Sequence, residues 1–267
     1  MSFKIVVLAK QVPDTRNVGP EAMTPEGTIN RSALPAVYNP EDLNALEMAL
    51  RIKEQIAGAT VTVITMGPDR AEAVVREAIY RGADEGFVLS DRRFAGADTL
   101  ATSYAISCAI EHLGHVDLIV GGRQAIDGDT AQVGPQVAEK MDIPQITYAE
   151  ELLAVSEKSI RIKRRIADGT EVVESTLPAL VTVSGSAPDC RFRHAHRVLQ
   201  NRHLTVPILS ADDVNPDFNR LGFAGSPTKV KKVDSVVLTQ KDNLQIENTQ
   251  EAINELVSNL VTNHIIG

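Results

Sequence analysis

A chain of 267 residues, 43% of them hydrophobic, can build one large core or a domain with an extension. Its formal net charge of -8 argues against binding to nucleic acid or to an anionic lipid surface. Two cysteines, Cys108 and Cys190, with no C-x-x-C pair, indicate a reducing compartment, and no apolar run is long enough to span a bilayer. We therefore expect a cytoplasmic protein without a signal peptide or membrane insertion.

The first half of the chain alternates between predicted strands and helices. The strands are residues 3–9, 60–66, 86–89 and 118–120, and the helices begin at Pro40 or span 69–81, 98–112 and 133–141. Asn39 and Asp98 are expected to cap the starts of their helices. This alternation predicts an α/β fold: a doubly wound, mostly parallel sheet with helices on both faces.

The connection between the first strand and the helix at Pro40 is unusual. It has about thirty residues, whereas such loops usually have two to six. A loop of this length is either disordered or functional, and the segment Gln11-Val12-Pro13-Asp14 at its start favours function.

The pattern changes after Pro144. Residues 146–155, 159–165 and 171–175 are short strand-like runs, and Asp168-Gly169 is a hairpin turn signal between the last two. Residues 179–183 form another buried strand. We predict a β-hairpin of about residues 155–177, inserted before the last strand of an α/β domain that spans 1–204.

Residues 191–203 are basic and include His194, His196 and His203. A His-x-His pair could bind a metal, but no carboxylate or cysteine cluster accompanies it, so we expect no metal site. The segment is predicted to be an exposed helix or a loop that contacts a partner.

Residues 205–267 are predicted to be an extended linker, with a possible strand at 235–238, followed by a helix. Asn248 and Glu251 form a capping box, and Ile253, Leu256, Val257, Leu260 and Val261 form an apolar stripe. This stripe either folds back on its own core or docks on a partner subunit.

The loop of residues 121–136 follows a buried strand and leads into a helix. Strand, glycine-bearing loop and helix together present free backbone N–H groups to an anion. Asp129 and Gln132 have capping-box spacing, which would leave the N–H groups of 131–134 for a phosphate. The small residues Gly128, Ala131 and Gly134 would let a ligand approach the backbone. Two alternatives remain: a tight turn with two capping aspartates, and a magnesium site formed by Asp127 and Asp129.

The topology places this loop next to the long one. Doubly wound sheets bind ligands beyond the carboxyl ends of the strands, where the strand order reverses. If the strand ending at Ala9 neighbours the strand ending at Val120, their loops share one crevice, with Met66 at the same edge. We predict a nucleotide site built mostly from backbone. Asp127 is available for a ribose hydroxyl, and Arg123 is either a phosphate ligand or a solvated surface charge.

Several segments carry a resemblance to a known family. Residues 10–14, 39–42, 66–68, 82–84 and 122–133 match, as does the signature-like segment from Arg165 through Asp168-Gly169 to Thr182. Over nearly its whole length the chain resembles the beta subunit of electron-transfer flavoproteins.

The resemblance implies a heterodimer with an alpha subunit that carries FAD, and an adenine nucleotide in this subunit. The cofactor-binding residues that it implies are Ala9, Asn39, Asp42, Met66, Gly122, Arg123, Gln124, Ala125, Asp127, Gly128, Asp129, Thr130, Ala131, Gln132, Val133 and Gly134. The nucleotide is AMP in ordinary members and a second FAD in the electron-bifurcating branch.

Two segments bear on the branch and the partner. Ordinary members usually carry Asn-Gln-Thr where this chain has Ala131-Gln132-Val133, and the stretch 127–134 resembles the bifurcating branch. That branch exchanges hydride with NAD(H) and divides the electrons between a ferredoxin and the alpha-subunit flavin. The dehydrogenase-recognition segment departs from the family pattern and reads Cys-Arg-Phe-Arg-His-Ala-His at 190–196. The partner dehydrogenase is therefore expected to be a flavin-dependent 2-hydroxyacid (lactate-type) enzyme or an acyl-CoA enzyme.

Two other functions stay open. The chain could hold AMP without taking part in redox chemistry and serve as a docking surface, or it could be an unrelated nucleotide-binding regulator. No catalytic residue is predicted, because a flavin carries the chemistry itself.

Overall fold

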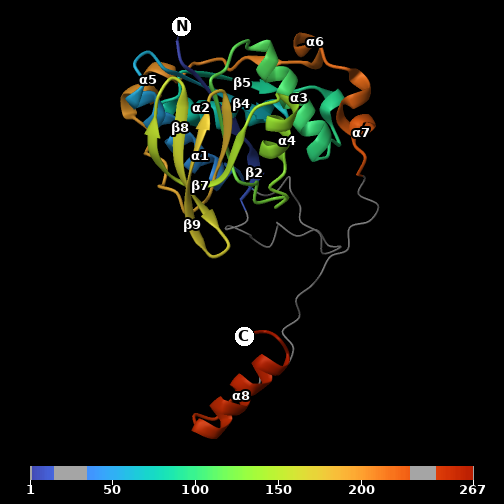
Figure 1. The fold of residues 1–267 in the computed structure, drawn as a ribbon. Coiled ribbons are helices and arrows are strands. Elements are labelled where there is room, and N and C mark those ends of the chain that lie inside the picture. The colour runs from blue at the N-terminus through green and yellow to red at the C-terminus, as the bar shows by residue number, and fades with distance from the viewer. Residues whose placement is uncertain (1, 15–34, 229–244, 267) are drawn as a thin grey trace.

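The computed structural model describes residues 2–14, 35–228 and 245–266, which include a nine-stranded sheet of order β11-β5-β4-β1-β6-β10-β7-β8-β9 and a two-stranded ribbon, β2–β3 (Figure 1). The strands are β1 (Lys4–Ala9), β2 (Gln11–Pro13), β3 (Ala36–Tyr38), β4 (Thr60–Met66), β5 (Glu85–Leu89), β6 (Leu118–Gly122), β7 (Gln145–Val155), β8 (Ser159–Ile166), β9 (Gly169–Thr176), β10 (Ala179–Val183) and β11 (Ile208–Leu209). The α-helices are α1 (Pro40–Gln55), α2 (Glu72–Arg81), α3 (Thr99–His112), α4 (Val133–Lys140), α5 (Ala195–Asn201), α6 (Ala211–Val214), α7 (Gly222–Gly225) and α8 (Gln250–Thr262). Single-turn 3₁₀ helices within the described ranges are η2 (Asp69–Ala71), η3 (Arg92–Phe94) and η4 (Phe218–Arg220).

Strand β1 lies at the centre of the sheet, and the strand order reverses beside it. It pairs in parallel with β4 on one side and with β6 on the other, so that Val7 lies between Val63 and Val120. Every pair from β11 to β7 is parallel. The predicted doubly wound fold is therefore confirmed, and the loops after β1 and β6 begin at the same edge.

The predicted hairpin extends the sheet at one end. Strand β7 pairs in parallel with β10 and antiparallel with β8, and β8 continues antiparallel to β9. Ile162 of β8 lies between Leu152 and Val173, so the inner face of the hairpin continues the apolar core.

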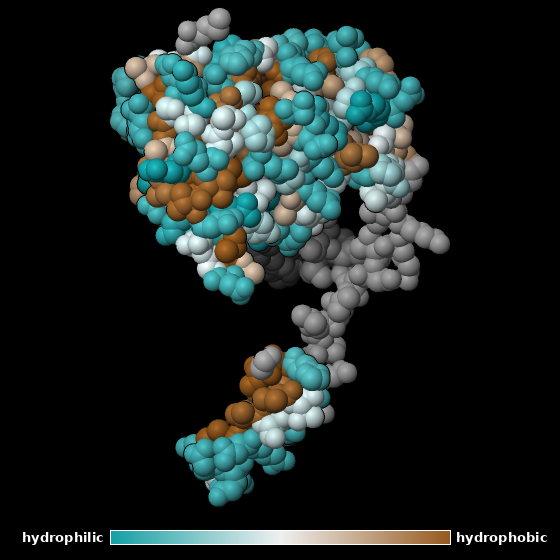
Figure 2. Space-filling view, in the orientation of Figure 1, coloured by the Kyte–Doolittle hydropathy of each residue, from teal (hydrophilic) through white to brown (hydrophobic). Residues whose placement is uncertain are grey.

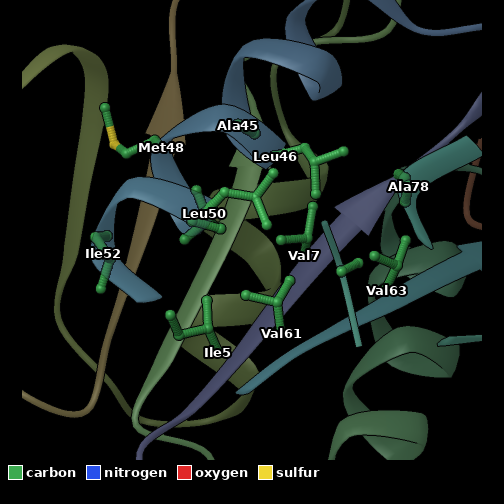
Figure 3. Close-up of a cluster of buried hydrophobic side chains, with 14 of the residues drawn as sticks. Ile5, Val7, Ala45, Leu46, Met48, Leu50, Ile52, Val61, Val63 and Ala78 are labelled. Carbon is green, nitrogen blue, oxygen red and sulfur yellow. The ribbon is translucent and has the colours of Figure 1, made fainter. Parts of the chain in front are cut away.

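The core has two layers because β1 is buried on both faces. Ile5 and Val7 face α1 and α2, as Figure 3 shows around Leu46 and Leu50 of α1 and Ala78 of α2. The alternate residues of β1 face α3 and α4. A strand buried on both faces reads as the continuous apolar run seen in the sequence.

Residues 206–228 differ from the predicted linker. β11 extends the sheet by pairing with β5, with Ile208 opposite Val88. Val206, Ala211 and Leu221 are buried against the body. The prediction missed them because such short elements leave too few residues for a periodic pattern. The possible strand at 235–238 lies outside the described residues.

Helix α8 ends the chain with its apolar stripe uncovered. Thr249 rather than the predicted Asn248 caps it, since the Thr249 hydroxyl accepts from the N–H of Ala252 (3.3 Å). Ile253, Val257 and Val261 are 41–49% exposed, and Figure 2 shows this apolar face open. None of the helices in the described ranges has the length and apolar character needed to cross a bilayer.

Candidate nucleotide-binding site

A cavity of about 420 Å³ opens at the sheet edge where β1, β4 and β6 end. Its wall is formed by Leu8, Ala9, Lys10, Asp42, Met66, Phe94, Gly96, Ala97, Asp98, Thr99, Thr102, Ile106, Gly121, Gly122, Arg123, Gln124, Ala125, Gly128, Asp129, Thr130, Ala131, Gln132, Val133 and Gly134. Every residue expected to contact a nucleotide lines this cavity except Asn39 and Asp127. These residues therefore form one wall of the cavity, and their binding of a nucleotide stays a prediction.

Asn39 and Asp127 lie behind the wall and shape the loop. The Asn39 side chain donates to the carbonyl of Gln124 (2.9 Å) and accepts from the N–H of Ile126 (3.1 Å). Asn39 occupies the cap position of α1, and Pro40 is the first helical residue, both as expected, but the Asn39 side chain makes no capping bond to the helix. Asp127 forms an ion pair with Lys10 (2.7 Å). Both residues tie the loop after β6 to the segment around β1 and α1.

The opposite wall, from Phe94 to Thr99, was not predicted as part of the site. It follows β5, which ends at the same sheet edge as β1 and β4. Asp98 caps α3 as expected, because its side chain accepts from the N–H of Ala101 (3.0 Å). The parallel sheet could have indicated this wall, because every loop that follows a parallel strand begins at the edge where such sheets bind ligands.

Asp98 also holds the start of the C-terminal segment. Its second carboxylate oxygen accepts from the N–H (3.1 Å) and the hydroxyl (2.6 Å) of Thr228, and its own N–H donates to Ser226 (2.8 Å). The cavity wall and the last described residues of the body are thus joined at one side chain.

Helix α4 begins without a side-chain cap. The predicted capping box of Asp129 and Gln132 is wrong, because the helix starts at Val133 and the residue at its cap is Gln132. The Asp129 carboxylate instead accepts from the side chain of Gln124 (2.8 Å). Asp129 and Ala131 have positive φ values of 48° and 53°, so the chain turns twice before the helix begins.

The backbone N–H groups of residues 130–134 have no acceptor among the described residues. They belong to the loop and first turn that line the cavity. An uncapped helix N-terminus with a partial positive charge suits an anion. The expected free donors at 131–134 are therefore present, although no capping box frees them.

The glycines of this region have separate roles. A Cβ at Gly128 would meet nothing within 4 Å, so this position leaves open space beside the loop. A Cβ at Gly134 would lie 2.6 Å from the methyl group of Thr182, so packing against β10 requires that glycine. At Gly122 a Cβ would lie 2.3 Å from Oδ1 of Asp42. Only Gly128 fits the predicted role of clearing room for a ligand.

Arg123 and Asp127 already have partners of opposite charge. Arg123 forms an ion pair with Glu41 (2.9 Å), whose carboxylate also accepts from the N–H of Gln124 (3.0 Å). The magnesium alternative loses support because Asp127 is held by Lys10 and Asp129 by Gln124. The donors that remain for an anion are chiefly backbone groups.

Asp42 bridges the ends of the two central strands. Its carboxylate accepts from the N–H of Lys10 (2.8 Å) and from the N–H of Gly122 (3.1 Å). Burial raises the pKa of this carboxyl from 3.8 to about 7, against the opposing effect of its hydrogen bonds. The Asp42 side chain therefore holds together the points at which the loops after β1 and β6 leave the sheet.

The arginines of the basic segment 190–196 pair with glutamates of α1 and α2. Arg191 pairs with Glu47 (2.9 Å) and Glu54, and Arg193 pairs with Glu77. Phe192, between them, is 92% exposed. This segment therefore presents an exposed aromatic ring beside arginines whose charges are paired with glutamates.

The fold and the cavity define a doubly wound α/β protein whose candidate site lies where the strand order reverses. The model of the electron transfer flavoprotein domain matches residues 26–213. The chain therefore belongs to the electron transfer flavoprotein family.

Three similar proteins are named as subunits of an electron transfer flavoprotein or of CoA-ester reductase systems. The electron transfer flavoprotein subunit beta of Thermoanaerobacterium thermosaccharolyticum is 44% identical over 265 residues, which cover 99% of this chain and 100% of that protein. Subunit CarD of the caffeyl-CoA reductase-Etf complex of Acetobacterium woodii is 40% identical over 265 residues, with the same coverage. The acryloyl-CoA reductase electron transfer subunit gamma of Anaerotignum propionicum is 40% identical over 273 residues, again covering 99% of this chain and 100% of that protein.

Proposed function

We propose that this beta subunit binds FAD in the cavity beside β1 and β6 and takes part in flavin-based electron bifurcation. The observation that carries the proposal is the row of unpaired N–H groups at residues 130–134 along the cavity wall. A pyrophosphate carries several acceptor oxygens and suits such a row of backbone donors.

The residues present fit a phosphate-bearing nucleotide. The cavity volume falls within the range of small-molecule sites, and the space at Gly128 is open. Lys10 and Arg123 offset the carboxylates of Asp127 and Glu41. Asp129, the other carboxylate of the loop, accepts from the neutral side chain of Gln124, which holds it in place without offsetting its charge.

A bound flavin would supply the redox chemistry, accepting hydride from NADH and releasing electrons toward a ferredoxin and the alpha-subunit flavin. The chain's own part is to bind and orient. The loop 130–134 donates to the phosphates, while Asp42 and Asn39 fix the two strand ends from which the site is built.

The proposed partners follow from the family and from two surfaces. The family implies an alpha subunit, and the stripe of α8 supplies an uncovered apolar face for it. Deleting residues 249–267 should weaken the heterodimer and leave the melting temperature of the isolated chain unchanged. An unchanged sedimentation coefficient of the complex, with a lower melting temperature, would place α8 on its own body.

The dehydrogenase partner is proposed to dock at the exposed Phe192. Relatives named for caffeyl-CoA and acryloyl-CoA reductases favour a CoA-ester enzyme, while the unusual segment 190–196 favours a 2-hydroxyacid enzyme. Comparing Phe192→Ala with the unmodified complex in electron transfer to each enzyme class tests this. Equal rates of transfer to both classes before and after the substitution would remove Phe192 from the docking surface.

Nucleotide content decides between FAD and AMP. The purified heterodimer is extracted with acid, and the released nucleotides are separated by chromatography. Two FAD per heterodimer supports the proposal. One FAD and one AMP would leave the alternative, in which this subunit holds AMP for a structural purpose and docks a dehydrogenase.

The reaction is tested anaerobically by following NADH and ferredoxin absorbance together. Ferredoxin reduction by NADH should occur only while the dehydrogenase and its oxidised substrate are present, or the same coupling should run in reverse. Ferredoxin that stays oxidised with every substrate of both classes would contradict bifurcation.

A further inference from the structure

Helices α3 and α4 begin side by side at the cavity. Thr99, the first residue of α3, donates its hydroxyl to the side-chain oxygen of Gln132 (2.8 Å). The same hydroxyl accepts from the side-chain amide of Gln136 (3.4 Å). Thr99 therefore holds the residue at the cap of α4 and the residue one turn further along.

Ser103 adds a second connection between the helices. Its hydroxyl contacts the side-chain oxygen of Gln136 (3.2 Å) and the carbonyl of Leu100 (2.9 Å). Thr99 and Ser103 are one turn apart on α3, and Gln132, at the cap of α4, is one turn before Gln136. These four residues, the polar ladder, make all the hydrogen bonds between side chains of α3 and α4 within the described ranges.

The polar ladder contacts α4 at its first turn, which is the least stable part of this helix. Helix α4 has eight residues, no side-chain cap and two residues of positive φ just before it. The first turn of an uncapped helix frays readily, because its N–H groups gain nothing from the helical geometry. Val137 and Ala138 anchor the second half of α4 in the core, but the first turn is only partly buried.

We infer that Thr99 is a positioning residue for the phosphate end of the nucleotide. Through Gln132 and Gln136 it fixes the direction of the N–H groups at 130–134. The inference rests on the proposed nucleotide site and adds a residue from the opposite wall. Because Thr99 acts on the anion-binding donors, its loss should affect a phosphate-bearing ligand and spare the same ligand without phosphate.

The test uses the full-length chain, freed of bound nucleotide, with AMP and adenosine as probes in calorimetric titrations. Thr99→Val keeps the shape of the side chain and removes the hydroxyl. We expect about three- to tenfold weaker AMP binding, the usual effect of losing one net hydrogen bond. Adenosine binding should stay within about twofold, a change too small to reflect a lost hydrogen bond.

Two variants serve as controls. Thr99→Ser restores a hydroxyl and should recover AMP affinity. Ser107→Ala removes a hydroxyl two turns further along α3. Among the described residues this hydroxyl bonds only to the carbonyl of Tyr104 in its own helix (2.8 Å), so the variant should leave AMP affinity unchanged.

Each other outcome has a defined meaning. Equal AMP affinity of Thr99→Val and the unmodified chain would overturn the inference. Equal losses for AMP and adenosine would reduce Thr99 to a structural residue and overturn it as well. If the unmodified chain binds neither AMP nor FAD, the proposed nucleotide site itself fails, and the inference fails with it.

Discussion

Helices α1 and α4 both begin at the edge of the cavity, but their first turns are built in opposite ways. The first turn of α1 contains Glu41 and Asp42, whose carboxylates bond to groups at the ends of β1 and β6. The first turn of α4 contains no acidic residue and no capping side chain.

The first turn of α1 thus has a structural role, whereas the first turn of α4 is open toward the cavity. A helix N-terminus carries a partial positive charge that favours a neighbouring anion. At α1 the protein supplies acceptor carboxyl groups itself and uses them to hold two strands. At α4 the described residues supply no such acceptor, and the proposed phosphate site lies there.

The largest effect is expected where α1 touches β6. Gly122→Ala would put a Cβ 2.8 Å from the backbone nitrogen of Asp42, and backbone cannot move aside. We expect the free energy of unfolding to fall by about 3 kcal/mol or more. Gly128→Ala, in open space, is the matched control and should change it by less than about 0.5 kcal/mol.

Urea titration of both glycine variants measures this contrast. If Gly122→Ala were as stable as Gly128→Ala, the contact between α1 and β6 would not be tight. The start of α1 would then be no more tightly packed than the start of α4.

The second effect is a pH dependence from Asp42. Its folded pKa of about 7 lies above the ordinary value of 3.8, so the folded state binds the proton more tightly. The contribution of this proton to the free energy of unfolding is fully present below about pH 4 and is lost as pH rises through 7. The free energy of unfolding of the unmodified chain, relative to that of Asp42→Asn, should fall by about 2 kcal/mol between pH 5 and 8.

Taking the difference in the free energy of unfolding between the unmodified chain and Asp42→Asn removes the contributions of other carboxylates. Glu47 and Glu77 have lowered pKa values, which their arginine partners cause against the opposing effect of burial, and they act in the opposite direction. A difference that stays constant across this pH range would show that Asp42 titrates normally.

The smallest effect comes from making α4 resemble α1. Gln132→Glu keeps the oxygen that accepts from Thr99 and adds a negative charge at the helix start. AMP affinity should fall about tenfold, and stability should rise by about 0.5 kcal/mol or stay the same. Adenosine binding serves as the control, and an unchanged AMP affinity in titration would place the phosphate elsewhere.

The sequence predicted the parallel core and one wall of the cavity because each rests on local patterns. Apolar runs such as residues 3–9 mark strands buried on both faces, and the glycine-bearing loop after β6 lines the cavity. The wall from Phe94 to Thr99 was missed, because its place depends on which strand ends share an edge. The pairing of Arg123 with Glu41 was also out of reach, since it joins residues 82 positions apart.

The same limit explains the errors at helix starts. Asn39 has a typical capping residue type and Asp129 has capping-box spacing, yet both side chains bond elsewhere. A residue type suited to capping is equally suited to bonding a distant loop. Tertiary contacts decide between these uses, and no local pattern contains them.

The position of β11 has a consequence for folding during synthesis. β5 is complete at residue 89, but its outer neighbour β11 is made only at residues 208–209. While the ribosome makes the intervening chain, β5 is an edge strand with unpaired backbone groups, which invite pairing with another chain. A nascent chain that stops before β11 would therefore be prone to aggregate even though most of its sheet is already built.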